Sequence, residues 1–200
     1  MSLLNDAVRM LEQLELPLPV HCSNELERAY ERSHIDLLYA MQVHCNITQE
    51  LAVCVHTKQS APVARLLVHR KKIHPSSYGM VIELRESFLE CAPTQSVVYA
   101  LAHELAHVLL LTRNSPFQIS EKLTDICAMA LGYEHAVLGG RQYVEASERE
   151  QKAAQFKWWA SSLVPQLWRS TVKLPWKTLG YLTEDEVTQY AELVQTLRQP

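Results

Sequence analysis

The 200-residue sequence predicts a single α+β domain, for which three observations argue. Apolar residues recur at helical spacing near both ends of the chain, strand-like runs occupy residues 51–84, and a strongly apolar helix follows them. A hydrophobic content of 48% is sufficient for one ordinary core. We therefore expect one domain, 1–200, with a helical N-terminal part (1–48), a central core (49–138) and a helical C-terminal part (139–200).

Charge and composition disfavour several classes of partner. A net charge of -3 and an isoelectric point near 6.3 give no electrostatic basis for binding nucleic acid. The short basic run 69–72 is typical of a solvated strand end. No apolar stretch is long enough to span a bilayer, so we expect no membrane partner. The start of the chain lacks a secretory pattern and the cysteines have no C-x-x-C spacing, which favours a reduced, cytoplasmic protein of undetermined oligomeric state.

The N-terminal part is expected to contain two helices. Residues 3–16 carry apolar side chains at helical spacing, and Pro17 ends that pattern. Ser23 is expected to cap a second helix that runs to about His44, with Ile35 among its buried residues.

Three strands are expected next. Residues 51–55, 64–68 and 79–84 are short runs rich in β-branched and other apolar residues. Residues 73–78, which include a proline and two serines, predict a turn. Residues 86–90 predict a short helical turn before the apolar helix.

The C-terminal third predicts further helices and one joint. A helix is expected to begin around Ser120 and to end before Gly132, and Gly139-Gly140 is expected to be flexible. Residues 147–167 show helical spacing. Residues 183–186, Thr-Glu-Asp-Glu, form a capping box, which is typical of the start of a helix.

The apolar helix carries the strongest chemical signal. We expect it from Thr94, as N-cap, to about Arg113, and it contains H-E-x-x-H at His103, Glu104 and His107. The two histidines lie on one helix face, so both imidazoles can bind one cation, and Glu104 is placed to act as a general base. On an exposed helix these residues would need no ligand, but this helix is apolar nearly all round and hence buried. Buried polar groups need partners, and a zinc ion, one per chain, suits all three.

A third ligand is expected from residues 120–125. Glu121 and Asp125 are four residues apart, so both carboxylates lie on one helical face. We expect Glu121 to bind the metal and Asp125 to accept a hydrogen bond from the outer nitrogen of His103, which fixes the tautomer of that ligand. The alternative exchanges the two roles. A further interpretation is that both carboxylates lie in solvent at the start of a helix, where the helix dipole stabilises them and they bind no metal. However, an apolar run follows Asp125, which is therefore expected to be buried.

The order of these motifs resembles that of zincin metallopeptidases of the gluzincin type. It is most similar to a group of poorly characterised bacterial zinc metallopeptidases with H-E-L-A-H, E-x-L-T-D and G-Y-L motifs, here at 103–107, 121–125 and 180–182. The resemblance covers roughly residues 79–195. It implies a minimal zincin fold: a small sheet of about three strands, a buried H-E-x-x-H helix, a second ligand helix and flanking helices. It also implies that Met80–Leu84 is an edge strand that lines the cleft and pairs with an extended peptide.

The activity implied is hydrolysis of a bond in a peptide or protein substrate. Zinc lowers the pKa of its bound water to about 7, and Glu104 would take the proton as that water attacks an amide carbonyl. The oxyanion needs a second donor besides the metal. We expect Tyr181, which lies in a matched motif, ahead of His135, Tyr133 and Arg141.

Two other readings of the same residues stay open. A catalytically silent, zinc-stabilised module could bind a protein or peptide in the cleft, and a latent enzyme could have its cleft covered by its own terminal segments. A purely structural site has no use for a base such as Glu104 and is usually closed by a fourth ligand, often cysteine. Cys127, two residues beyond Asp125, should face away from the ligands, which disfavours such closure.

Overall fold

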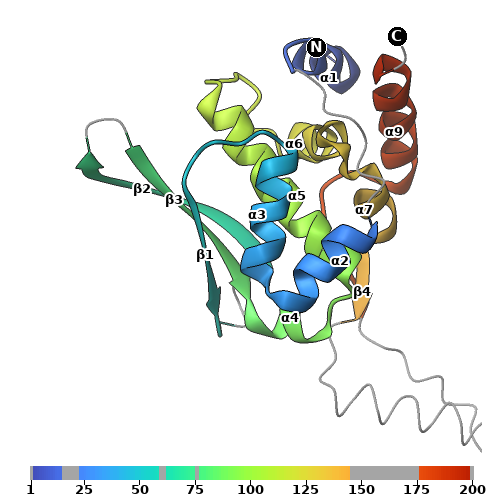
Figure 1. Ribbon diagram of the computed structural model, residues 1–200. Coiled ribbons are helices and arrows are strands. Elements are labelled where there is room, and N and C mark those ends of the chain that lie inside the picture. The colour runs from blue at the N-terminus through green and yellow to red at the C-terminus, as the bar shows by residue number, and fades with distance from the viewer. Residues whose placement is uncertain (1, 15–22, 59–61, 75–76, 145–175, 199–200) are drawn as a thin grey trace, which may run out of the picture.

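A computed structural model describes residues 2–14, 23–58, 62–74, 77–144 and 176–198. Within these residues the fold is mixed α and β, with a small sheet on one side of a central buried helix and further helices around it (Figure 1). The elements are α1 (Leu3–Glu12), α2 (Ser23–Arg32), α3 (His34–His44), β1 (Leu51–His56), β2 (Ala64–His74), β3 (Ser77–Arg85), α4 (Glu86–Cys91), α5 (Thr94–Thr112), α6 (Glu121–Ala128), the π-helical turn η1 (Met129–Tyr133), α7 (Glu134–Gly139), β4 (Gln142–Val144), β5 (Trp176–Thr178) and α9 (Glu184–Arg198).

The main sheet has the strand order β1–β3–β2. β3 lies in its centre, parallel to β1 and antiparallel to β2, so the expectation that Met80–Leu84 forms an edge strand is wrong. The edge position was an implication of the resemblance, and the apolar run that predicted the strand itself does not distinguish an edge from a centre. The edge strand beside α5 is β2, whose Leu66 amide hydrogen-bonds the carboxylate of Glu104. The strand at the site is therefore one element earlier in the chain than expected.

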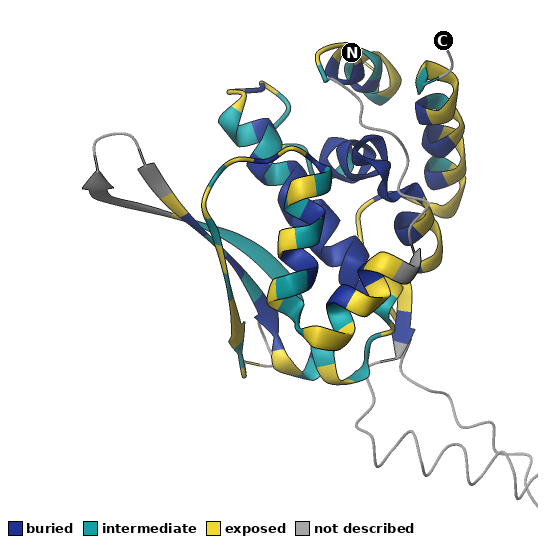
Figure 2. Ribbon diagram, viewed as in Figure 1, coloured by how far each residue is buried: buried dark blue, intermediate teal, exposed yellow. Residues whose placement is uncertain are grey.

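α5 is the buried centre of the molecule. It runs from Thr94 to Thr112, with the dark blue of buried residues along most of its length (Figure 2). Its extent agrees with the sequence expectation, and its end is marked by Asn114, whose φ of 51° is left-handed. The expected cap is wrong: Pro93 occupies the N-cap position and Thr94 is already helical. A proline with extended backbone can begin a helix without a side-chain cap.

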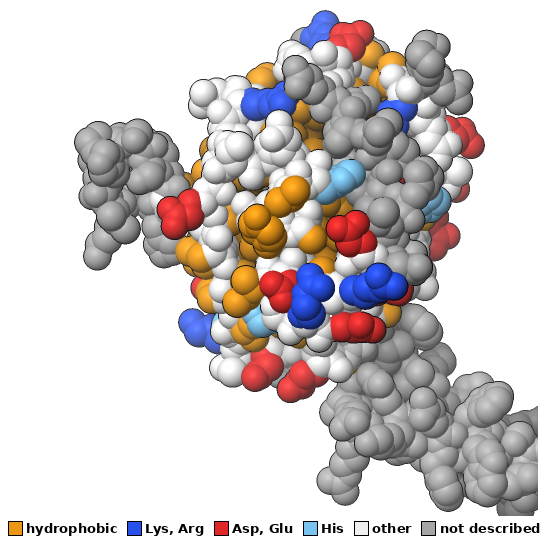
Figure 3. Space-filling model, in the orientation of Figure 1, with side chains coloured by type: hydrophobic (Ala, Val, Ile, Leu, Met, Phe, Trp, Pro, Cys, Tyr) orange, Lys and Arg blue, Asp and Glu red, His pale blue; other side chains and the backbone are white. Residues whose placement is uncertain are grey.

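The expected helix from Ser23 to about His44 is in fact two helices. Ser33 lies between them with extended backbone (φ −172°, ψ 160°), and its hydroxyl accepts from the Asp36 amide at 3.0 Å. Serine competes for backbone hydrogen bonds in this way, so it begins α3 instead of continuing α2. Ile35, expected to be buried, is 58% exposed. It lies with Tyr39 and Val43 on the outer face of α3, where hydrophobic side chains gather (Figure 3).

The C-terminal elements confirm one expectation and correct another. The capping box is present, because Thr183 and Glu186 exchange hydrogen bonds between side chain and amide, at 2.8 and 3.3 Å. Gly139-Gly140 is not a flexible joint: a Cβ on Gly140 would lie 2.4 Å from the carbonyl oxygen of Gln95, so close packing against α5 requires glycine there. The expected helix over 147–167 lies outside the described residues. None of the helices in the described part of the chain has the length and apolar character to cross a membrane.

Candidate metal centre

Two helices bring three potential metal ligands together. α5 supplies His103 and His107, and α6 supplies Glu121 at its first position, after Ser120, whose hydroxyl accepts from the Leu123 amide. Glu121 Oε2 lies 3.0 Å from His103 Nε2 and 3.2 Å from His107 Nε2. The ligand atoms of all three residues lie within 4.8 Å of one another, which is a geometry that could hold a metal ion. The structure thus brings together the three candidate ligands that the sequence indicated.

Asp125 lies behind His103, fully buried. Its Oδ1 is 2.8 Å from His103 Nδ1 and accepts from the Tyr99 hydroxyl at 2.8 Å, while its Oδ2 accepts from the Tyr181 amide at 2.7 Å. The contact with the outer nitrogen of His103 is the one expected from the sequence. Because both carboxylate oxygens are engaged on this side of the ring, the arrangement favours Glu121 over Asp125 as a ligand.

Tyr99 is a member of this network that the sequence analysis missed. Its ring is buried, and burial, with the adjacent Asp125, raises the pKa of its hydroxyl. The signal that could have found it is its position four residues before His103, on the same face of the helix.

The hydrogen-bonding capacity of His103 tests whether a metal ion fits. A neutral imidazole that donates from Nδ1 to Asp125 offers only a lone pair at Nε2, yet Nε2 lies 3.0 Å from another acceptor, Glu121 Oε2. His107 Nε2 approaches the same oxygen at 3.2 Å. Lone pairs converge in this way only around a positive charge, which is a proton or a metal ion. Two imidazole nitrogens and a carboxylate oxygen are a donor set that suits a divalent transition metal.

The protonation of the metal-free cluster reflects this demand for positive charge. Burial opposes protonation of His103, but the hydrogen bonds that its ring donates to the carboxylates of Asp125 and Glu121 raise its pKa to about 10. Burial and the neighbouring charge of His103 lower the pKa of His107, and the hydrogen bond with His103 leads the causes that lower the pKa of Glu121. Burial raises the pKa of the nearby Glu104 to about 7. A carboxylate with this pKa can both take and return a proton near neutral pH.

Gly180 allows a backbone segment to approach this network. It has φ +81°, and a Cβ there would lie 1.8 Å from the Tyr99 hydroxyl oxygen and 3.0 Å from Asp125 Oδ2. Any residue other than glycine would strain the backbone, collide with the Tyr99 hydroxyl and crowd the carboxylate of Asp125. Gly180 therefore permits the next amide, that of Tyr181, to donate to Asp125.

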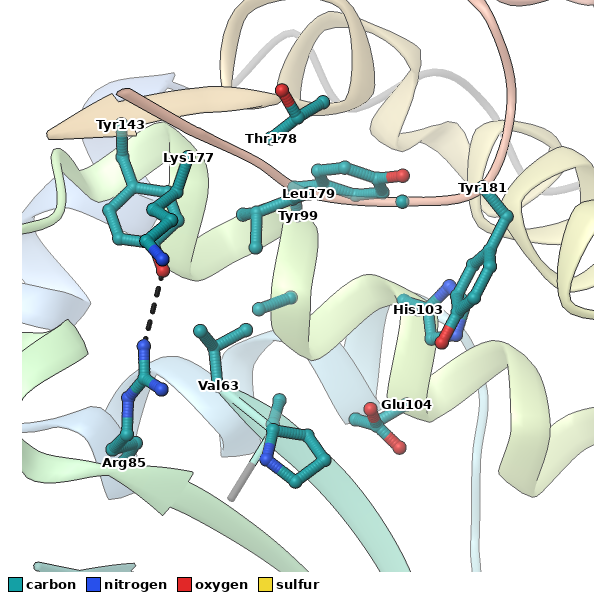
Figure 4. A pocket seen from close by; sticks show the side chains of 14 residues that line it. Val63, Arg85, Tyr99, His103, Glu104, Tyr143, Lys177, Thr178, Leu179 and Tyr181 are labelled. Carbon is teal, nitrogen blue, oxygen red and sulfur yellow. Dashed lines mark hydrogen bonds between the residues drawn. The ribbon is translucent and has the colours of Figure 1, made fainter. Parts of the chain in front are cut away.

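Tyr181 is half-exposed beside the ligands. Its ring stacks on that of His103, with centroids 5.7 Å apart and planes at 28°. Figure 4 shows both side chains on the same wall of a cavity, with Glu104 below them in the view. The other three residues considered as oxyanion donors, namely His135, Tyr133 and Arg141, do not line that cavity. Tyr133 donates to the Met41 carbonyl and Arg141 to the Leu182 carbonyl.

The cavity beside the ligands has a volume of about 400 Å³. Its walls are the face of α5 that carries His103 and Glu104, the start of β2, and the β4–β5 ribbon with the segment after it (Figure 4). Three polar residues in it, Arg85, Tyr143 and Lys177, were not indicated by the sequence, in which no motif or spacing links them. The cavity is lined by Pro62, Val63, Ala64, Arg85, Tyr99, Ala100, His103, Glu104, Tyr143, Lys177, Thr178, Leu179, Gly180 and Tyr181.

Cysteine does not enter the group of ligands in the described part of the chain. Cys127 is fully buried, and burial raises the pKa of its thiol to about 12.

Comparisons with models of protein families, with curated proteins and with solved structures gave no match. The functional interpretation therefore rests on the geometry of the site.

Proposed function

We propose that the chain is a zinc-dependent metallopeptidase of the zincin type. The observation that carries this proposal is the convergence of two imidazole nitrogens and one carboxylate oxygen at the edge of a cavity whose wall contains one of these residues, His103, and the buried Glu104. Three protein ligands leave one position of a tetrahedral ion for water or substrate, as catalytic zinc sites do. A structural site would more often have a fourth protein ligand, and the described residues offer none.

The proposed roles follow from the position of each group. His103, His107 and Glu121 would hold zinc, which supplies a Lewis acid that polarises a carbonyl and lowers the pKa of bound water to about 7. Glu104, buried beside these residues, would take the proton of the attacking water and return it to the leaving amine.

The surrounding residues orient this chemistry. Asp125 holds His103 in the tautomer that presents Nε2 to the metal. Tyr181 is the proposed donor to the oxyanion, because it is the tyrosine that lines the cavity on the ring of His103. β2 replaces Met80–Leu84 as the strand proposed to pair with an extended substrate, since it is the sheet edge beside Glu104.

Metal analysis and a single isosteric variant test the proposal. Purified wild type and Glu104→Gln should each bind one zinc per chain, measured by elemental analysis, because Glu104 is not among the three ligands. Zinc-loaded wild type should produce new peptide termini in a mixed peptide library analysed by mass spectrometry, and Glu104→Gln should produce at least about 1000-fold fewer.

The outcomes separate the proposal from its alternative. Zinc binding without hydrolysis by the wild type would favour a zinc-stabilised module that binds a peptide or protein. Full hydrolysis by Glu104→Gln would exclude the proposed base. Absence of bound metal after zinc reconstitution would exclude both readings.

A further inference from the structure

The main sheet has an unpaired edge at β1, opposite the edge formed by β2. β1 pairs with β3 on one side, and no strand in the described part of the chain pairs with its other side. β1 lies at the outside of the sheet (Figure 1), and much of it has the yellow of exposed residues (Figure 2). Ala52, Cys54 and Val55 are exposed along it. Such an edge presents a row of backbone donors and acceptors to another strand.

The residues of β1 contain none of the usual features that keep an edge strand from pairing. Natural edge strands are protected by charged residues, by proline or by bulges. The six residues Leu51–His56 include no Lys, Arg, Asp, Glu or Pro, and their register with β3 runs through the whole strand without a shift. At about 3.3 Å per residue, they provide a regular edge about 20 Å long.

The charges that flank β1 favour a second copy of the same strand, in the antiparallel direction. Glu50 precedes the strand, Lys58 follows it, and both are exposed. When two copies run antiparallel with Cys54 opposite its equivalent, Val53 of each copy lies opposite Val55 of the other. The same register places Glu50 opposite Lys58, twice about the two-fold axis, and opposite charges across a ladder stabilise pairing. Parallel pairing in register would instead place like charges together.

An exposed apolar stripe on α3 lies beside this edge. Ile35, Tyr39 and Val43 are spaced by four residues, so they share one face of the helix, and each is more than half exposed. α3 contacts β1 and lies on the same side of the sheet as α5 (Figure 1). A two-fold axis perpendicular to the sheet keeps both copies of α3 on that side, so the two stripes approach each other across the axis. Their burial would add apolar contact to the strand pairing.

We propose that the β1 edge binds the β1 edge of a second copy of the chain, antiparallel and centred on Cys54. The two three-stranded sheets then form one sheet in the order β2–β3–β1–β1–β3–β2. β2, whose Leu66 amide contacts Glu104, stays at the outer edge of both copies. The inference goes beyond the proposed function, and neither depends on the other.

Sedimentation velocity of the full chain measures the pairing. We expect monomers of 22.9 kDa in reversible equilibrium with dimers. The Kd should be roughly 1–100 μM, because one strand ladder and one apolar stripe make a small interface. A chain that stays monomeric up to about 1 mM, ten times the weakest Kd expected, would overturn the inference. In that case β1 is covered by another segment of the chain or left in solvent.

Exchanged charges test the identity of the partner and the direction of pairing. Glu50→Lys places two ammonium groups opposite each other at both ends of the ladder, and Lys58→Glu places two carboxylates there. Each variant alone should therefore dimerise about 3–10-fold more weakly than the wild type. An equimolar mixture restores opposite charges at both ends and should recover the wild-type affinity as a heterodimer, which also shows that both variants are folded. A mixture as weak as its components, or variants as strong as the wild type, would overturn the antiparallel register.

A short bis-maleimide crosslinker locates the two-fold axis. Wild-type dimers should be linked through Cys54 of both copies, because directly opposed residues have Cβ atoms about 5 Å apart, and mass spectrometry of the linked peptides identifies the site. Ala52→Cys in a Cys54→Ser background is the matched control. It moves the thiol two residues along the same strand face, so the two copies are offset by four residues, about 13 Å, and should link poorly. Equal linking at both positions, or dimers without a link at Cys54, would overturn the proposed centre.

Single substitutions separate the edge from the stripe. Cys54→Lys places like charges opposite each other at the axis and should weaken the dimer at least about 10-fold. Tyr39→Ser removes the aromatic residue of the stripe and should weaken it about 10-fold. Leu138→Ser removes an exposed apolar side chain from α7, on the far side of α5 from β1 (Figure 1), and should have no effect. Dimers that persist unchanged in Cys54→Lys would place the contact on another surface and overturn the inference.

Discussion

The two histidines of one motif are supported very differently. His103 is 9% exposed, lies 2.8 Å from Asp125 through Nδ1, and stacks on Tyr181. His107 is more exposed, and its Nδ1 lies 3.5 Å from the oxygen of the Thr124 hydroxyl, whose own proton is donated to the Ser120 carbonyl. Residue type and helical spacing are the same for both, so the difference comes from what other segments place behind each ring.

This contrast divides the site into an oriented half and an adaptable half. The ring of His103 is fixed before a ligand arrives, by a carboxylate that itself has donors from Tyr99 and Tyr181. The ring of His107 lies at the open side, where a weak contact leaves it more freedom. A metal ion entering the site would therefore meet one preorganised ligand and adjust the other.

Removing each histidine should give the largest effects and separate the two halves. His103→Ala and His107→Ala should each weaken zinc binding by at least about 1000-fold, since each removes one of the three proposed ligands. In the metal-free state, His103→Ala should also lower the free energy of unfolding by about 3–5 kcal/mol, because it leaves the carboxylate of Asp125 buried without the imidazole that it contacts. His107→Ala should cost about 1 kcal/mol. Zinc titration and urea unfolding measure both, and equal destabilisation would contradict the unequal support.

A change at Gly180 should break the oriented half without touching a ligand. Gly180→Ala adds a methyl group 1.8 Å from the Tyr99 hydroxyl oxygen at a left-handed φ, so we expect a loss of about 3 kcal/mol and weaker zinc binding. Gly79→Ala is the matched control, because a Cβ there meets nothing within 4 Å. Thermal unfolding compares the two variants. A Gly180→Ala protein with wild-type stability would mean that residue 180 is not packed closely against Tyr99 and Asp125.

The pH dependence of the metal-free fold should distinguish the two rings by sign. The pKa of folded His103, about 10, exceeds its ordinary 6.5, so its protonation contributes stability that is complete below pH 6.5 and is lost as pH rises towards 10. The pKa of Glu104 is also raised, so its protonation likewise contributes stability that is lost as pH rises from 4.5 to about 7. The pKa of His107 is lowered, so His107 has the opposite effect: stability is lost as pH falls below 6.5.

Unfolding in urea at several pH values measures this. Between pH 6.5 and about 8.5 the free energy of unfolding of the metal-free wild type should fall by at most about 3 kcal/mol. Zinc-loaded protein should lose less, because the metal takes the place of the proton. Persistence of the full slope in His103→Ala would assign it to another group.

The supporting residues should give the smallest and most graded effects. Asp125→Asn keeps the shape of the side chain but weakens its acceptance of the His103 proton, so zinc affinity should fall about 10–100-fold. Thr124→Val removes the weak contact to His107, and zinc affinity should fall less than about 3-fold. Competition with a fluorescent zinc chelator resolves both values. Equal losses would show that the two halves are supported alike.

The three candidate ligands of this site were predictable because their spacing is local. H-E-x-x-H and the four-residue separation of Glu121 and Asp125 define helix faces, and those faces meet in the structure. Tyr99 belongs to the same local pattern and was overlooked. Arg85, Tyr143 and Lys177 meet only through the pairing of separate strands, which helical or strand periodicity does not encode.

The fold was predictable to a similar degree. The positions of the strands and of α5 followed from apolar periodicity, and the capping box at Thr183 was recognisable from four residues. The strand order was not, because β1 and β2 both pair with β3 through backbone groups that every sequence possesses. The break at Ser33 was missed because apolar spacing continues across it, while a single hydroxyl decides where α3 begins.

The hydrogen bond that the Tyr181 amide donates to Asp125 joins residues 56 positions apart, so during synthesis it forms long after Asp125 has been added to the chain. The histidines, Glu121 and Asp125 are all synthesised before the segment that orders His103 exists. A nascent or prematurely terminated chain that stops before residue 180 carries every ligand of the motif, but it lacks one donor to Asp125 and one wall of the cavity. The complete site is therefore a property of chains extended through Tyr181, and shorter translation products do not possess it.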